Sequence, residues 1–114
     1  MGSSYAGYEH IYFWDRTSSS YNWRLETTHK YKDPAAWYHV VFHYDSAQAL
    51  ANDRAKIFVN GLRITDFAQE SYPSLNYNGR LNTASQAHGI MKQQYSSSPA
   101  YRDGILAEYH FMDG

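Results

Sequence analysis

Residues 53–67 have the sequence DRAKIFVNGLRITDF and predict a two-stranded antiparallel hairpin closed by Asn60-Gly61. Asn-Gly between alternating apolar residues is a strong hairpin signal, because both central residues of the turn need a positive φ. A two-residue turn also fixes the register. The pairs expected on the apolar side are Val59–Leu62 and Ile57–Ile64. The pairs expected on the solvated side are Phe58–Arg63, Lys56–Thr65 and Arg54–Phe67.

Five further segments have the composition or alternation of β-strands: residues 8–14, 21–27, 37–45, 88–92 and 104–112. In 21–27, Tyr21, Trp23 and Leu25 alternate with polar residues, which predicts a half-buried strand paired with 8–14. Neither face of 37–45 is polar, so this strand is expected at the centre of a sheet. Residues 46–52 predict one short helical turn with Ser46 as its cap.

Two long polar segments, 68–86 and 93–103, are predicted to be loops, and loops of this length in a small domain are usually functional or poorly ordered. Short strands separated by turn signals, without a long helical pattern, indicate an all-β fold. We expect an antiparallel two-sheet β-sandwich or jelly roll.

The 114 residues are enough for one domain, predicted to span residues 1–114. The formal net charge of −1 gives no reason to expect nucleic acid as a partner. There is no cysteine, so disulfides and thiolate metal sites are excluded. No apolar run approaches the roughly 20 residues that span a bilayer, and we expect no membrane insertion. Twelve tyrosines are unusual and suit strands and contact surfaces.

Three segments in order carry a resemblance to a known family: DPAAWYHVV (33–41), RAKIFVNG (54–61) and DGILAEYHFMDG (103–114). Together they resemble the laminin-G-like branch of the concanavalin A-like lectin/glucanase superfamily. The resemblance is to the domains of this branch that occur in bacteriophage tail fibre, tail spike and decoration proteins. The similarity runs from about Asp33 to the end of the chain, and the segment 72–76 fits it.

The resemblance implies a concanavalin A-like jelly roll located on the virion, at the particle surface. Relatives have more strands before the Trp-x-His strand than the two predicted here, so the sandwich would be incomplete at its N-terminus. The chain would then be a piece of a longer domain, or a partner chain would complete its sheets. The implied partners are other virion protein chains, including copies of this one in a homo-oligomer, and cell-surface glycan.

No catalytic constellation is evident, and we expect no enzymatic activity. Glucanase relatives use two carboxylates along one strand. The nearest approach here is Glu108 and Asp113, which are five residues apart and therefore on opposite faces. The other glutamates, Glu9, Glu26 and Glu70, stand alone.

No metal site or other cofactor is expected from the motifs. His39 and His43 would lie roughly 13 Å apart along a strand, so packing in the sandwich for His39 and exposure for His43 are the better expectation. Calcium, which many laminin-G-like domains bind, is the one ion for which the loops offer oxygen ligands. Those candidates are Asp45, Asp53, Asp66, Asn76, Asn78 and Asn82, and solvated turns explain them equally well.

Carbohydrate contact is the commonest activity in the family, and it requires aromatic faces beside amide or carboxylate groups. The loops supply both. The candidate carbohydrate-binding residues are Tyr72, Tyr77, Asn78, Tyr95, Tyr101 and Asp103. Packing of the loops or subunit contacts by these tyrosines is the competing explanation. A non-enzymatic virion module is the first hypothesis, and a secreted carbohydrate-binding module or glycoside hydrolase is the alternative.

Overall fold

A computed structural model describes residues 10–17, 20–33, 35–79 and 106–112 of the chain. The chain divides into two compact units, residues 1–80 and 81–114. In the second unit, residues 106–112 are exposed and form no helix or strand. The strand predicted at 104–112 is therefore wrong for residues 106–112. The strand predicted at 88–92 lies outside the described residues.

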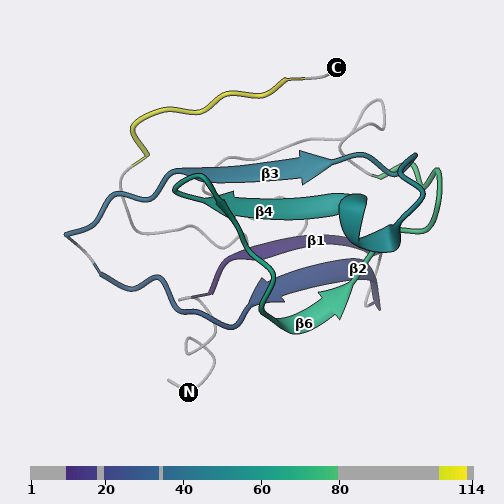
Figure 1. The fold of residues 1–114 in the computed structure, drawn as a ribbon, viewed down its shortest axis with the longest axis horizontal. Helices are drawn as coiled ribbons and strands as arrows, with labels where there is room; N and C mark the ends of the chain where they lie inside the picture. Colours follow the sequence, from purple (N-terminus) through teal and green to yellow (C-terminus); the bar gives the residue numbers. More distant parts are fainter. Residues whose placement is uncertain (1–9, 18–19, 34, 80–105, 113–114) are drawn as a thin grey trace. The chain divides into compact units, whose positions relative to one another are not determined.

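The first unit is all-β and consists of two antiparallel three-stranded sheets (Figure 1). One sheet has the order β1-β2-β6, with β1 at Tyr12–Thr17, β2 at Ser20–Thr27 and β6 at Phe67–Ser71. The other has the order β3-β4-β5, with β3 at Val40–Tyr44, β4 at Ala55–Val59 and β5 at Leu62–Arg63. A 3-10 turn at Ala51–Asp53 precedes β4, and the described part of the chain contains no α-helix.

The Asn60-Gly61 turn is confirmed, with φ angles of 51° and 82°. The predicted pairs Phe58–Arg63 and Val59–Leu62 are also confirmed. Ile64 N donates to Ile57 O at 2.8 Å, which extends the register by one more hydrogen bond. The turn residues therefore set the local pairing as their chemistry requires.

The register prediction fails beyond Ile64, because the chain leaves this sheet there and joins the other one. The ladder between β4 and β5 does not include the predicted pair Lys56–Thr65, and Phe67 pairs with Thr27 of β2 rather than with Arg54. Residues 68–71 were predicted to begin a loop, and that prediction is wrong. These residues belong to strand β6. Its polar sequence FAQES lacks the apolar alternation of a strand, because four of its five residues are exposed.

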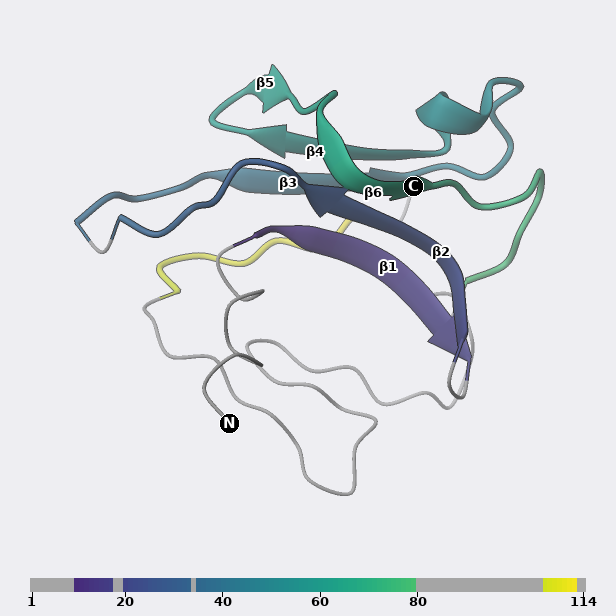
Figure 2. The ribbon, with the colours of Figure 1, turned by 90° about the horizontal axis from the view of Figure 1, so that it is seen from below.

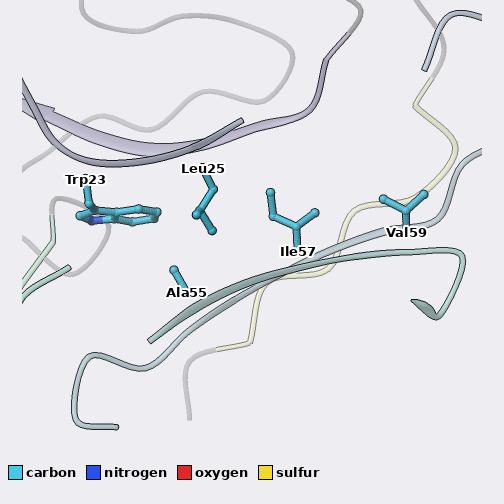
Figure 3. Close-up of a cluster of buried hydrophobic side chains, with 5 residues drawn as sticks. All are labelled: Trp23, Leu25, Ala55, Ile57 and Val59. Carbon is cyan, nitrogen blue, oxygen red and sulfur yellow. The ribbon is translucent and has the colours of Figure 1, made fainter. Parts of the chain in front are cut away.

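The apolar core lies between the two sheets and consists of Trp23 and Leu25 from β2 with Ala55, Ile57 and Val59 from β4. Figure 3 shows the two groups of side chains pointing toward one another. Every second residue is buried along β4 and along residues 23–27 of β2, as expected for strands with one face on a core. Burying one Leu or Ile side chain contributes about 1.5–3 kcal/mol.

Strand β3 was predicted at the centre of a sheet, and β4 occupies that position instead. β3 lies at one end of its sheet as far as the structure describes it, and Val41, Phe42 and His43 are exposed. His39, expected to pack in the core, is exposed as well. An apolar pattern on both faces indicated burial, but only one described strand is available to pair with β3.

The turn after β3 is capped by Asp45 and not by Ser46. Asp45 Oδ1 accepts a hydrogen bond from Ala47 N at 3.1 Å, and its Oδ2 accepts one from Gln48 Nε2 at 2.7 Å. These bonds hold the pKa of the Asp45 carboxyl below its ordinary value. The helical turn predicted at 46–52 is wrong for residues 46–50, and a 3-10 turn forms at Ala51–Asp53 instead.

Candidate functional site

Tyr72, the first carbohydrate candidate, lines a groove of about 110 Å³ together with Lys56, Arg63 and Glu70. The charged groups and the phenol of this groove have partners within the protein. Tyr72 Oη donates to Glu70 Oε1 at 2.7 Å, and Arg63 Nη2 donates to Asn52 O at 2.7 Å. Burial and the hydrogen bond to Glu70 raise the pKa of the Tyr72 phenol. The groove therefore offers a ligand few unused donors.

Asp53 holds the two cations of this groove. Its Oδ1 lies 3.2 Å from Arg63 Nη1 and 3.5 Å from Lys56 Nζ. Both ion pairs are partly exposed, and such pairs stabilise a fold by at most about 1 kcal/mol. The two ion pairs also neutralise Lys56 and Arg63, which are the cations that an anionic ligand in this groove would need.

Tyr77, the second candidate, is committed to the interior of the first unit. Its ring packs against the core, and its Oη donates to Asp15 Oδ2 at 2.5 Å. The Tyr44 hydroxyl donates to Tyr77 O at 2.5 Å, while the Tyr44 ring stacks on Trp23 with 5.7 Å between centroids. Burial raises the pKa of the Tyr44 phenol. These contacts fasten the segment after β6 to both sheets.

The candidates do not form one cluster among the described residues. Tyr72 and Tyr77 are engaged by different partners, and Asn78 is exposed. Tyr95, Tyr101 and Asp103 lie outside the described residues. For Tyr72 and Tyr77, the observed contacts match the alternative in which loop tyrosines pack the loops onto the body of the protein.

A second group of aromatic and cationic side chains gathers on the outer face of the sheet β1-β2-β6. It consists of Trp14, Arg16, Tyr21 and Arg24, and we call it the aromatic–arginine cluster. Trp14 pairs with Arg24, and Arg16 pairs with Tyr21. Directly paired residues share a face, and Arg24 lies between the buried Trp23 and Leu25, so this face points away from the core.

A β-bulge places Tyr21 in this cluster. The register shifts between Asp15 and Arg16, so Asn22 is the additional residue of β2. The Asn22 side chain, on an exposed residue, donates to Asp15 Oδ2 at 2.7 Å and to Thr17 Oγ1 at 2.9 Å. Tyr21 was predicted on the same face as Trp23, and that prediction is wrong because one extra residue reverses the alternation. Figure 2 shows β1 and β2 running side by side and curving strongly.

The cluster has a defined geometry. The Trp14 and Tyr21 rings are perpendicular, with centroids 5.6 Å apart and an interplanar angle of 88°. The Cζ atoms of Arg24 and Arg16 lie 4.4 Å and 5.3 Å from the centroid of the Tyr21 ring. Trp14 is 38% exposed and Tyr21 is 43% exposed. The predicted strand 8–14 ended at Trp14, whereas β1 continues to Thr17. Because Arg16 was left outside the predicted strand, the cluster could not be predicted from the sequence.

The three aspartates among the calcium candidates are engaged by different partners, and Asn82 lies outside the described residues. Asp45 caps its turn, Asp53 pairs with Lys56 and Arg63, and Asp66 Oδ1 accepts from Thr28 Oγ1 at 3.0 Å. Within the described ranges, no three His, Cys, Asp or Glu side chains converge as metal ligands would. Nor does the described part contain a helix long and apolar enough to cross a bilayer.

Comparison with protein-family models, with curated proteins and with solved structures finds no match to this chain. The class of the protein therefore follows from its own structure. The first unit is an all-β assembly of two antiparallel sheets that share one core. The laminin-G-like resemblance is carried by the sequence motifs alone and stays a prediction.

Proposed function

We propose that this chain is a non-enzymatic structural or adhesive module of a bacteriophage particle, built as a laminin-G-like jelly roll. The module binds other chains of the particle, and it does so through the outer edge of β3. The observation that carries the proposal is the composition of that edge. β3 has the sequence VVFHY and contains no Asp, Glu, Lys or Arg.

The other edge strands of the first unit are protected by charge or by length. β1 carries Asp15 and Arg16, β6 carries Glu70, and β5 has only two residues. Folded proteins use charged residues and short strands to stop edges from pairing with other chains. β3 is the described edge strand that lacks these devices, and Val41 and Phe42 are 40% and 48% exposed.

The backbone of β3 is also oriented for pairing. Asp45 N donates to Arg54 O, and Asn60 N donates to His39 O, both at 2.8 Å. Because hydrogen-bonded and non-hydrogen-bonded pairs alternate in an antiparallel ladder, Val41 and His43 bond to β4. The N–H and C=O groups of Val40, Phe42 and Tyr44 therefore point away from β4. They can receive an additional strand, and we assign it to a second copy of this chain.

The test is the association state of the full chain in solution, measured by sedimentation equilibrium. Wild type should associate, and Val41→Lys should be monomeric because it places a charge on the exposed side of the edge. Leu75→Lys is the matched control, since it puts the same charge on an exposed residue outside the strands. A wild-type chain that is monomeric at high concentration would contradict the proposal. Release of reducing sugar from a polysaccharide would contradict its non-enzymatic part.

A further inference from the structure

We propose that the aromatic–arginine cluster binds an acidic saccharide, one that carries a carboxylate or sulfate group. This site is distinct from the β3 edge, and the inference does not depend on the association of copies. It is also distinct from the loop residues predicted to bind carbohydrate. The cluster combines a flat apolar surface with two cations, which are the two features that such a sugar requires.

The two guanidinium groups are available for an anion. Neither Arg16 nor Arg24 forms an ion pair within the described part of the chain, in contrast to Arg63 in the groove. Their contacts are with the Tyr21 ring, at 5.3 Å and 4.4 Å. A cation–π contact fixes the position of a guanidinium without using its N–H donors. Those donors can form paired hydrogen bonds to one acidic group.

Arg16 also has a donor that the fold leaves unsatisfied. Its Nε is buried and has no acceptor among the described residues. Leaving a buried donor without a partner is unfavourable, and such groups are rare in folded proteins. A ligand cannot reach this buried Nε, and Trp23 Nε1 is buried without a partner in the same way. The terminal nitrogens of Arg16 and Arg24, which form no ion pair among the described residues, are therefore the groups assigned to the anion.

Trp14 supplies the flat surface. Successive outward residues of a strand are separated by about 7 Å, so a single sugar ring can contact both Trp14 and the two arginines. Glu26 lies on the same face beyond Trp14, because it pairs with Tyr12. Repulsion from Glu26 would direct the acidic group of the ligand toward the Arg16–Tyr21 end, with the sugar ring on Trp14.

Single-stranded nucleic acid is a less suitable ligand. Its binding sites use aromatic platforms for successive bases along a groove with many cations. Here the two rings are perpendicular, at 88°, and cannot stack on parallel bases. Two arginines on a chain of net charge −1 also provide little attraction for a polyanionic backbone.

The experiment is affinity electrophoresis of the full chain in gels containing one polysaccharide, supported by tryptophan fluorescence titration. The acidic probes are polygalacturonate and dextran sulfate, and the neutral probes are galactan and dextran. We expect retardation by at least one acidic probe, and no retardation by the neutral ones. Binding should weaken as salt is added, because the interaction is between exposed charges.

Three variants test the assignment of residues. Arg24→Gln and Trp14→Ala should each weaken binding about tenfold, whereas Tyr21→Phe should retain it because the ring is preserved. Arg63→Gln is the matched control, since it removes the same charge from the other sheet. Circular dichroism checks that each variant is folded.

Four results would overturn the proposal. They are equal retardation by acidic and neutral probes, no retardation by any probe, equal loss of binding in Arg63→Gln and Arg24→Gln, and tighter binding of oligothymidylate than of either acidic polysaccharide. The last result would assign the cluster to nucleic acid. None of these results depends on the association state, so failure here leaves the proposal about β3 intact.

Discussion

At the level of single residues, Asp15 concentrates the polar interactions inside the first unit. It is only 8% exposed, and its Oδ2 accepts hydrogen bonds from Asn22 and Tyr77. A buried carboxyl group is tolerated when donors surround it, and is strongly destabilising when they are removed. Asn22 is the bulge residue of β2, so the same residue that turns Tyr21 outward also supplies a donor to Asp15. The inner polar contact and the outer aromatic–arginine cluster are therefore linked.

Tyr77→Phe tests this interaction. The substitution keeps the aromatic ring on the core but removes the hydroxyl donor, so Asp15 loses one of its hydrogen bonds. We expect a loss of about 1–3 kcal/mol in the free energy of unfolding, measured by urea denaturation. Tyr38→Phe is the matched control, because the Tyr38 side chain is 36% exposed and its observed contact is between rings. Equal effects of the two substitutions would contradict the assignment.

At the level of elements, β4 is the strand on which the sheet β3-β4-β5 depends. It pairs with a neighbour on each side, and Ala55, Ile57 and Val59 all face the core. β5 belongs to the same hairpin, yet its two residues are exposed. The two strands share a turn and an apolar pattern, but only β4 faces β2 across the core. Their contributions to stability should therefore differ greatly.

Ile57→Ala and Leu62→Ala measure that difference within one hairpin. Ile57 is fully buried, so its truncation leaves a cavity and should cost about 2–5 kcal/mol of stability. Leu62 is 73% exposed, and its truncation should change stability by no more than about 0.5 kcal/mol. Chemical denaturation of the two variants gives both values. Comparable losses would mean that β5 is buried against something beyond the described residues.

The elements also show why the sequence predicts some features and misses others. The hairpin was predictable because Asn60-Gly61 determines its own turn. Strand β6 was not, because only its pairing with β2 makes the polar segment 67–71 a strand. The bulge at Asn22 likewise depends on how β1 continues.

The candidate site was limited in the same way. Tyr72 and Tyr77 were chosen because they are aromatic residues in a predicted loop. Tyr77 is engaged by Asp15, which lies 62 residues earlier in the chain. The aromatic–arginine cluster depends on the bulge and on a strand that was predicted to end too early. Local patterns identify residue types, but long-range pairing decides which of them are available to a ligand.

At the level of the whole molecule, tyrosines join parts of the first unit that are distant in sequence. Tyr44 links β3 to the segment after β6, and Tyr77 links that segment to Asp15 of β1. Burial raises the pKa of the phenols of Tyr31, Tyr44 and Tyr72, because it disfavours the charged phenolate. The folded protein therefore holds these protons more tightly than the unfolded chain, where tyrosine has a pKa of about 10.

The sign of the pH dependence follows from linkage. A group whose pKa is raised by folding contributes its full stabilisation below the unfolded pKa, and this contribution is lost as the pH rises. We therefore expect the free energy of unfolding to begin to fall as the pH approaches about 10 and to keep falling above it, through the raised pKa values of the folded protein. Tyr72→Phe should make this fall smaller, because it removes a phenol that is buried and hydrogen-bonded to Glu70.

Urea denaturation of wild type and Tyr72→Phe at about pH 8 and about pH 11 checks this expectation. Tyr21→Phe is the matched control, since it removes a phenol whose ring is 43% exposed. Deprotonation of lysines affects all three proteins equally and cancels in the comparison. A fall in stability that is the same in wild type and Tyr72→Phe would show that the Tyr72 proton is not held by the fold.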